Sequence, residues 1–549
     1  MTYVYVYKAC ANFLTLRVTQ ILDFYEVVNS ACKKDFLQAH QLSFRKIYPV
    51  RPEDFPKDIQ PYVVPEPSGR LVYRCLHCAG EHGIEKLLYI CPDCGSVLLL
   101  VDAQFDRLKD IPGSTWRKIF DYRRMLNLPA LNGIYRYHEF TGPVIPLDSV
   151  VWLGEGHTPI VEASDYLQGR AGARFFFKND GQNPSASFKD RGMASALSYI
   201  NYLLAYGYVD DILAICASTG DTSAAAALYA SYLHPRVKSA VLLPHGKVTP
   251  QQLSQPLGSG AMVFEIPGVF DDCMKVVEQL SDNYNVALLN SKNAWRILGQ
   301  ESYSYEVAQF FEYDMKNRVV VVPVGNAGNI TALMSGFLKF YETGIIDDLP
   351  MIIGVQSVNA NPVYRYYLEE NPEKRRFEPV HVSPSVAQAA MIGNPVSMPR
   401  VIRLAEQYDR LAGERKVFVV AVSEQEIMDW HLVANRHGHV SCTHGGECLA
   451  GMVAAVRQGL VDDSHSVVLD STAHALKFSN FQEMYFEDRF PAEYEVTPKP
   501  ELINAPVLVR PADLESVPES GKPLAGKALD RFISRVSEEI ANRLDVKKV

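Results

Sequence analysis

Residues 319–335 read VVVVPVGNAGNITALMS, and this stretch decides the fold class. Four consecutive valines place apolar side chains on both faces of a strand, which is typical of a buried strand in a parallel sheet. A glycine-rich turn follows at 325–329, and the apolar residues after it recur at helical spacing. A strand, a short turn and a helix in this order form one βα unit of an α/β protein.

The same pattern recurs on both sides of this stretch, beginning after about Phe175. Short aliphatic runs alternate there with longer helical segments, so we expect βα units around buried parallel sheets. The predicted strands are Ile212–Cys216, Val241–Leu243, Val319–Val324, Ile352–Val355, Val417–Val422 and Val467–Leu469.

The turn after the four valines suits a phosphate, because it presents backbone N–H groups and a helix N-terminus to one point. A tight βα turn would explain its glycines but not its two asparagines. The residues of this candidate phosphate site are Gly325, Asn326, Ala327, Gly328 and Asn329.

Three hydroxyl side chains follow the predicted strand Ile212–Cys216 and surround the start of an alanine-rich helix. They are Ser218, Thr219 and Thr222. One helix cap needs fewer hydroxyls than this, so the group is a candidate site for a second anion, such as a carboxylate.

A lysine lies at a predicted loop-to-helix junction in the sequence SASFKDRGM, residues 185–193. The positive end of the helix dipole favours the neutral, nucleophilic form of Lys189, which Schiff-base chemistry requires. Taken alone, the motif fits a surface lysine in a capped helix better than a catalytic one. An amine nucleophile, a phosphate site and a carboxylate site on one α/β body together indicate pyridoxal phosphate.

Six motifs, in this order, resemble those of threonine synthase, a fold-type II pyridoxal phosphate enzyme of the tryptophan-synthase-β-like group. The resemblance spans about Val151 to Phe490 and implies two three-layer αβα subdomains. The motifs are GEGHTPI from Gly154, SASFKDRGM around Lys189, STGDTSAA from Ser218, NSKNAWRILGQ from Asn290, PVGNAGNITA from Pro323 and STAHALKF from Ser471.

The resemblance also implies roles for individual residues. Lys189 would carry the cofactor and act as acid and base at Cα, with Phe188 beside the ring, and Thr472 would face the pyridine nitrogen. Ser218, Thr219 and Thr222 would hold the substrate carboxylate, while Asn290, Ser291 and Arg296 would hold a substrate phosphate. A surface salt bridge is the alternative role for Arg296. Asp221 departs from the asparagine of many relatives and would lie near the 3′-oxygen of the cofactor.

The implied reaction converts O-phospho-L-homoserine and water to L-threonine and phosphate, which makes the enzyme a carbon–oxygen lyase. Two separate candidate phosphate sites fit a phosphorylated amino acid as substrate. The alternatives are a serine/threonine dehydratase, a cysteate-synthase-like enzyme, or a binding module with a degenerate enzyme body. The KDRGM and NSKNAWR segments favour threonine synthase over the first two.

Two CxxC pairs indicate a zinc ribbon. The pairs occur in RCLHC and ICPDC, and twelve residues separate Cys78 of the first from Cys91 of the second. Two such knuckles joined by a hairpin can form a tetrahedral site with four sulfur ligands. A filled site of this kind is structural, because it leaves no open position for substrate. Two buried cysteine pairs without metal are the alternative. The candidate ligands are Cys75, Cys78, Cys91 and Cys94.

Composition limits the class of protein further. The 549 residues carry 54 Lys and Arg against 63 Asp and Glu, a net charge of −9, so we do not expect nucleic-acid binding driven by charge. We expect no membrane span, because Lys8 and Arg17 interrupt the most apolar terminal stretch. We expect no secretory signal, because this stretch lacks a basic start and a small-residue cleavage site. A cytoplasmic homodimer is the expected form.

Proline-rich stretches divide the chain. We expect an extension and linker at 1–70, the ribbon at 71–104, the catalytic domain at 105–490, and a C-terminal linker and helix at 491–549. Apolar residues from Leu529 to Leu544 recur every three or four positions, which predicts a helix that docks on the body or on a partner subunit.

Overall fold

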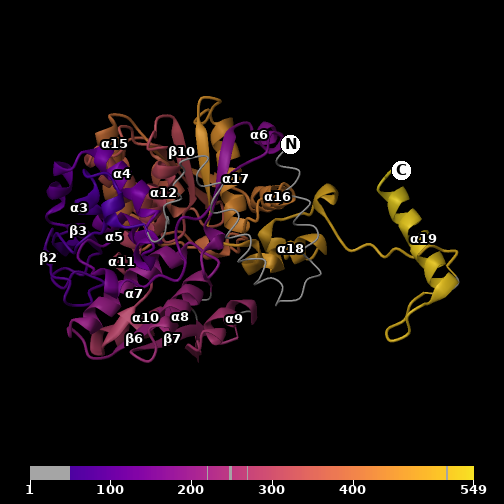
Figure 1. The fold of residues 1–549 in the computed structure, drawn as a ribbon, viewed down its shortest axis with the longest axis horizontal. Coiled ribbons are helices and arrows are strands. Elements are labelled where there is room, and N and C mark those ends of the chain that lie inside the picture. The colour runs from indigo at the N-terminus through magenta and orange to yellow at the C-terminus, as the bar shows by residue number, and fades with distance from the viewer. Residues whose placement is uncertain (1–49, 219, 247–249, 269, 515–516, 549) are drawn as a thin grey trace, which may run out of the picture.

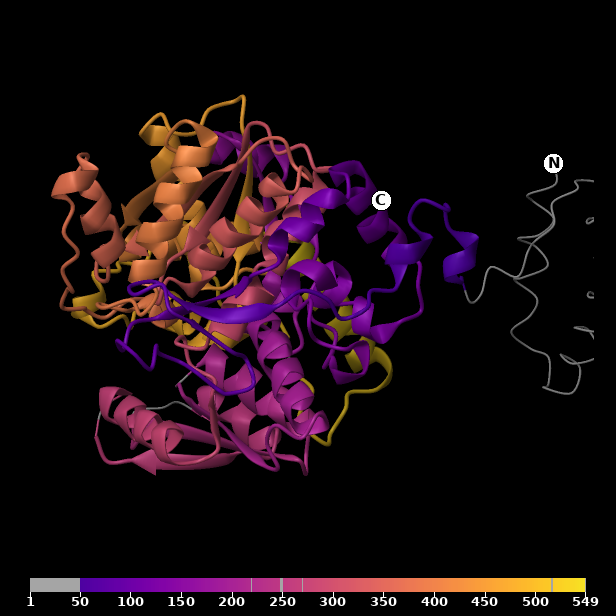
Figure 2. The same ribbon diagram turned by 90° about the vertical axis from the view of Figure 1, so that its left-hand side faces the viewer.

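The structure is a computed structural model that describes residues 50–218, 220–246, 250–268, 270–514 and 517–548. The expected extension at 1–49 and the candidate residue Thr219 lie outside the described residues. Two units, each a sheet covered by helices, form the body, and a small antiparallel ribbon packs against them (Figures 1 and 2).

A six-stranded sheet forms the centre of the larger unit, and all its neighbouring strands are parallel except the edge strand β4, which is antiparallel to β5. The strand order is β12 (Val417–Val422), β11 (Met351–Ser357), β10 (Arg318–Pro323), β13 (Ser466–Ser471), β5 (Arg174–Asn179) and β4 (Ile160–Glu162).

Both faces of this sheet are covered, as the valine run predicts. Val320 and Val322 of β10 pack into one core with α13 and α15, while Val319 and Val321 pack into another with α16 and α17. Alternate residues of a strand point to opposite faces, so an all-apolar strand requires helices on both sides. These helices are α13 (Gly328–Glu342), α15 (Met398–Ala412), α16 (Glu424–Arg436) and α17 (Thr443–Arg457).

The smaller unit is inserted between β5 and β10 in the sequence. Its sheet has four parallel strands in the order β8 (Met262–Ile266), β7 (Val237–Pro244), β6 (Ile212–Ala217) and β9 (Val286–Leu288). Its helices are α7 (Lys189–Ala205), α8 (Asp221–Tyr232), α9 (Pro250–Gly258), α10 (Phe270–Asn283) and α11 (Ala294–Gln300). All six strands predicted from the sequence are therefore confirmed, together with the two αβα units.

The ribbon consists of β1 (Leu71–Cys75), β2 (Glu81–His82) and β3 (Leu98–Asp102), paired antiparallel in the order β2-β1-β3. It lies across the junction of the two units (Figure 2). Leu71, Tyr73 and Leu98 share one hydrophobic core with helices α7 and α11. The ribbon is therefore part of the body and not a separate module.

The proline-rich segment before the ribbon is not a free linker, which corrects the sequence-based expectation. Phe55, Ile59 and Val63 are buried in the core of the larger unit, where Phe55 contacts Tyr122. Their spacing of four residues places the three side chains on one side of the chain, and the prolines lie between them. The segment includes α3 (Gln60–Val63) and packs on α4 (Gly113–Arg123).

The C-terminal helix α19 (Gly526–Arg543) forms where the apolar spacing predicts it. It lies apart from the body at the end of an extended segment, and none of its residues is buried (Figure 1). The expected docking on the body is thus absent, and docking on a partner subunit stays a prediction. Among the described helices, none has the length and apolar character needed to cross a membrane. The remaining helices are α5 (His138–Thr141), α6 (Asp165–Ala171), α12 (Ser302–Phe310), α14 (Pro362–Leu368) and α18 (Ser479–Phe486).

Candidate active site

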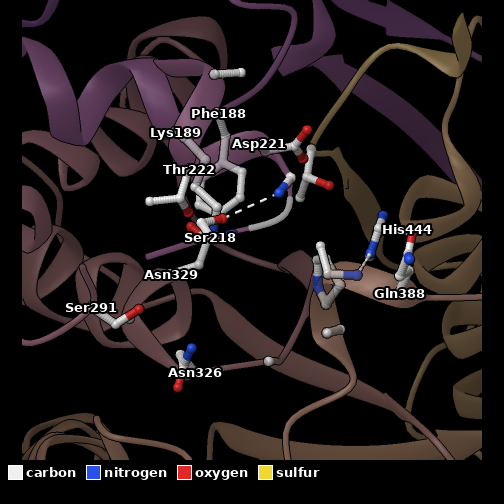
Figure 3. A pocket seen from close by; sticks show the side chains of 18 of the residues that line it. Phe188, Lys189, Ser218, Asp221, Thr222, Ser291, Asn326, Asn329, Gln388 and His444 are labelled. Atoms are coloured by element: carbon white, nitrogen blue, oxygen red, sulfur yellow. Dashed lines mark hydrogen bonds between the residues drawn. The ribbon is translucent and has the colours of Figure 1, made fainter. Parts of the chain in front are cut away.

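A pocket of about 840 Å³ is lined by residues of both sheet units. Its lining includes the segments that follow the carboxyl ends of β6, β9, β10 and β13. Ligands of open α/β sheets typically bind at this edge of the strands. Figure 3 shows Phe188, Lys189, Ser218 and Thr222 close together in this pocket.

Backbone pairing places Lys189 beside Thr472. The N–H of Phe188 donates to the carbonyl of Thr472 at 2.8 Å, and the N–H of His474 donates to the carbonyl of Ala186 at 3.0 Å. Helix α7 then begins at Lys189, as expected from the motif. A residue of the smaller unit and a residue at the end of β13 are thereby held at one point of the pocket.

The surroundings of Lys189 favour the neutral form of its amine. Burial, assisted by the positive charge of Arg296, lowers the pKa of Lys189 to about 7. The Nζ atom lies 4.1 Å from the centroid of the Phe188 ring. A lysine with this pKa is substantially neutral near pH 7, so it can attack a carbonyl carbon.

The glycine-rich turn passes so close to another segment that Gly325 cannot be replaced without displacement. A Cβ atom at Gly325 would lie 2.9 Å from the Cα of Ala390. Ala327 has a left-handed backbone with φ of 62°, and α13 starts at Gly328. The turn therefore brings backbone N–H groups and a helix N-terminus into the pocket, which is the arrangement that binds phosphate.

The two asparagines of this turn have structural partners. The Nδ2 of Asn329 donates to Oδ2 of Asp470 at 2.7 Å, and the carbonyl of Asn326 accepts the N–H of Ser397 at 3.2 Å. Burial raises the pKa of Asp470 to about 8. These contacts hold the turn in place at the pocket, whose lining includes all five of its residues.

Ser218 and Thr222 line the pocket at the start of α8, and Asp221 lies between them in the sequence. The Oγ of Ser218 accepts the N–H of Gly220 at 3.3 Å. Asp221 is buried and forms an ion pair with Lys477, whose Nζ lies 3.0 Å away.

Asn290, Ser291 and Arg296 also line the pocket, although their contacts differ. The side chain of Asn290 accepts the N–H of Ala217 at 3.0 Å and donates to the carbonyl of Ala217 at 2.6 Å, so it joins two loops. Arg296 is buried, donates from Nη1 to the carbonyl of Leu289 at 3.0 Å, and leaves its Nε without a partner. Burial lowers its pKa to about 10.

Within the described part of the chain, no carboxylate pairs with Arg296. A buried cation without a counterion is costly, and it favours an anionic ligand in the adjacent space. The surface salt bridge considered for Arg296 is therefore absent from the structure.

Sequence reasoning missed three pocket residues that the structure places near Lys189. Lys477 is contained in the STAHALKF motif, but nothing local indicates that its amine reaches Asp221. Gln388 and His444 lie together (Figure 3). The Nε2 of His444 accepts the N–H of Ala389 at 3.1 Å, and burial lowers its pKa to about 4, so it is neutral.

The four predicted cysteine ligands converge. The Sγ atoms of Cys75 and Cys94 are 3.4 Å apart, those of Cys78 and Cys91 are 3.6 Å apart, and all four lie within 4.8 Å of one another. Tetrahedral zinc with bonds of about 2.3 Å places its sulfurs about 3.8 Å apart. The N–H groups of His77 and Cys78 point to the Sγ of Cys75, which completes one knuckle.

The family model described as pyridoxal-phosphate dependent enzyme matches residues 151–472. The chain is 32% identical to threonine synthase of Methanocaldococcus jannaschii over 74% of this chain and 93% of that protein. It is 33% identical to chloroplastic threonine synthase 2 of Arabidopsis thaliana over 73% of this chain and 75% of that protein. The fold is similar to that of Escherichia coli threonine synthase, with a TM-score of 0.53 and 20% identity over 75% of this chain and 90% of that one.

Proposed function

Because the chain belongs to the threonine synthase family of pyridoxal-phosphate dependent enzymes, we propose that it converts O-phospho-L-homoserine and water to L-threonine and phosphate. The choice of a phosphorylated substrate rests on one observation. The buried, unpaired cation Arg296 lies in the same pocket as Lys189 but on a different segment from the glycine-rich turn. The pocket thus offers a second place for a phosphate beside the one that a cofactor would occupy.

The residues around Lys189 fit pyridoxal phosphate. The depressed pKa of Lys189 suits an amine that condenses with an aldehyde, and the Gly325 turn suits a phosphate ester. Thr472 offers a neutral hydroxyl for the pyridine nitrogen. When bound, the cofactor supplies an electron sink for carbanion chemistry at Cα and Cβ of the substrate.

The remaining roles belong to side chains of this chain. We assign the substrate carboxylate to Ser218, Thr219 and Thr222, and the γ-phosphate to Ser291 and Arg296, with Asn290 holding the loop. The amine of Lys189 would take the proton from Cα. Departure of the phosphate from Cγ would need one proton removed from Cβ and one added to Cγ before water adds at Cβ. The cation Arg296 stabilises the leaving phosphate, because guanidinium binds phosphate oxygens bidentately.

A serine/threonine dehydratase is the second candidate, since its chemistry needs the same lysine and cofactor. Its substrate has no phosphate, so the unpaired charge of Arg296 would have no ligand. The structure therefore favours the phosphorylated substrate.

The test is a parallel assay of one purified enzyme. The protein should show the visible absorption of lysine-bound pyridoxal phosphate, and borohydride reduction followed by peptide mapping should place the label on Lys189. Phosphate and threonine should form in equal amounts from O-phospho-L-homoserine. Ammonia released from threonine, without phosphate release from O-phospho-L-homoserine, would identify a dehydratase.

We also propose that one zinc ion binds Cys75, Cys78, Cys91 and Cys94 and stabilises the ribbon without contacting substrate. Support comes from the sulfur spacing and from the two CxxC knuckles. We further propose a homodimer that acts in the cytoplasm, which sedimentation and cell fractionation would test.

A further inference from the structure

The cysteine ribbon packs directly behind the loop Asn290–Lys292, which we call the phosphate loop. The indole Nε1 of Trp295 in α11 donates to the hydroxyl of Tyr73 in β1 at 3.0 Å. The same indole stacks on Tyr199 with ring centroids 4.0 Å apart and an interplanar angle of 11°. All three side chains are buried. The ribbon and the helix that follows the phosphate loop therefore form one rigid contact.

A second contact reaches the strand that leads into the phosphate loop. Tyr89, which lies between the two cysteine pairs, accepts the N–H of Leu288 at 2.8 Å through its hydroxyl oxygen. The same hydroxyl lies 3.4 Å from the carbonyl of Val286. Leu288 ends β9 and stands two residues before Asn290. The ribbon thereby supports the phosphate loop at its beginning as well as behind α11.

The third contact is a fully buried arginine that joins three segments. Arg400 of α15 donates to the carbonyl of Leu98 in β3 from Nε at 3.0 Å and from Nη2 at 2.6 Å. It also donates to the carbonyls of Ser291 at 3.4 Å and Lys292 at 3.2 Å. The same guanidinium donates to the hydroxyl of Ser397 at 3.0 Å.

Ser397 extends this contact to the cofactor side of the pocket, because its N–H donates to the carbonyl of Asn326 in the glycine-rich turn. The side chain of Arg400 thus touches the ribbon and the phosphate loop, and it reaches the turn through one residue. Guanidinium has five donors in a fixed plane, which suits it for holding several carbonyls in one geometry.

The charge of Arg400 is not neutralised by its neighbours. Its partners are carbonyls and one hydroxyl, and no carboxylate among the described residues pairs with it. Burial lowers its pKa to about 10, so it stays charged at neutral pH. With Arg296, a second uncompensated cation therefore lies next to the phosphate loop, and both favour an anion there.

We propose that the cysteine ribbon sets the geometry of the phosphate loop, with Arg400 and Tyr89 as positioning residues, and thereby determines the affinity for the phosphorylated substrate. This inference rests on the proposed function. It assigns the ribbon a role in substrate binding that is separate from its role in folding, although no ribbon side chain lines the pocket.

The test uses the full-length enzyme loaded with cofactor and four variants: Arg400→Met, Arg400→Lys, Tyr89→Phe and Tyr408→Phe. The last is the matched control. Its hydroxyl is also buried and donates to the carbonyl of Pro350 at 2.9 Å, but that contact is remote from the ribbon. Three quantities are measured: kcat and KM for O-phospho-L-homoserine, the Kd of inorganic phosphate by calorimetry, and the cofactor absorption.

In Arg400→Met we expect KM and the phosphate Kd to rise by about 10- to 100-fold, while the cofactor absorption is retained. Arg400→Lys should restore part of the affinity, since an ammonium keeps the charge but holds fewer carbonyls. Tyr89→Phe should raise both constants by about fivefold, because it leaves the Leu288 N–H unpaired. Tyr408→Phe should leave both constants unchanged.

Unchanged KM and phosphate Kd in a folded Arg400 variant would overturn the inference. If Arg400→Met does not fold, the KM and phosphate Kd of Arg400→Lys and Tyr89→Phe test the inference. Equal changes of these constants in Tyr89→Phe and Tyr408→Phe would contradict the inference. If the wild-type enzyme binds phosphate but does not turn over O-phospho-L-homoserine, the proposed function is wrong. The phosphate Kd values of the variants would still test the role of the ribbon in that case.

Discussion

The Nζ of Lys477 lies 3.0 Å from Oδ1 of Asp221, and this ion pair joins the two sheet units at the pocket. Lys477 follows β13 of the larger sheet, while Asp221 starts α8 of the smaller unit. The same amine donates to Oε1 of Gln255 at 2.8 Å and to the carbonyl of Ser185 at 2.9 Å. One side chain thus holds three segments of the smaller unit against the larger one.

Removing only the lysine of this pair should destabilise the protein. Lys477→Met leaves Asp221 buried without its counterion, which typically costs about 3–5 kcal/mol. Adding Asp221→Asn should recover much of the loss, since a neutral amide needs no counterion. Urea unfolding of the wild type, both single variants and the double variant gives the coupling free energy. Strictly additive effects would show that the ion pair does not hold the units together.

Cofactor loading should depend on pH through Lys189. Its pKa is lowered to about 7, so the neutral amine becomes the major form as pH rises through that value. The rate at which the apoenzyme gains the visible absorption should therefore fall about tenfold per unit below pH 7 and level off above it. Arg296→Met removes a nearby positive charge and should shift the midpoint to higher pH. A midpoint near that of free lysine would contradict this tuning.

Arg296→Ala should impair use of the phosphorylated substrate far more than it impairs cofactor binding. Losing one side of a desolvated charged pair costs about 2–5 kcal/mol. At about 1.4 kcal/mol per factor of ten, kcat/KM for O-phospho-L-homoserine should fall by tens to thousands of fold. The exposed Arg457→Ala serves as the control. Loss of the cofactor absorption in Arg296→Ala would instead assign the arginine to the cofactor phosphate.

Cys91→Ser should remove the zinc ion and lower stability together. The ribbon has little core of its own, so metal binding supplies part of its folding free energy. Metal analysis and thermal unfolding of the variant are compared with Cys273→Ser, which changes a buried cysteine outside the ribbon. A metal-free wild type with the same stability as a zinc-loaded sample would refute the zinc site.

Gly325→Ala should weaken cofactor binding sharply, because the new Cβ would lie 2.9 Å from the backbone of Ala390. Backbone atoms cannot move aside as a flexible side chain can, so the turn itself must shift. Gly169→Ala is the matched control, since nothing lies within 4 Å of its Cβ position in α6. Equilibrium dialysis of pyridoxal phosphate measures both affinities. Equal affinities would show that the turn tolerates the methyl group.

Local patterns were sufficient to predict the strands and helices that carry the candidate residues. The valine run predicts β10, the glycine-rich turn predicts the start of α13, and the CxxC spacing predicts the cysteine cluster. These features depend on residues that are neighbours in sequence, where the alternation of side chains and the geometry of turns act directly. The family resemblance rests on six motifs in a fixed order, and five of them, all except GEGHTPI from Gly154, contribute described residues to the pocket lining.

Such local patterns do not predict contacts between residues that lie far apart in the sequence. Prolines at 52–67 predicted a linker, yet Phe55, Ile59 and Val63 are buried in a core built by distant strands. The role of Asn290 in binding the substrate phosphate stays a prediction. The sequence does not indicate that its amide also bonds to the backbone of Ala217, which occurs because pairing of β6 with β9 brings the two loops together.

The sequence by itself determined the α/β class, the position of Lys189 at a helix start, the glycine-rich turn before α13 and the cluster of four cysteines. Only the tertiary structure decided that Lys477 pairs with Asp221. It also decided that Arg400, which lies 302 residues after Leu98 in the chain, joins the ribbon to the phosphate loop. The physical reason is that both contacts depend on how two sheets and a ribbon pack together. This packing, and not the neighbouring sequence, determines which groups lie within reach of a buried charge.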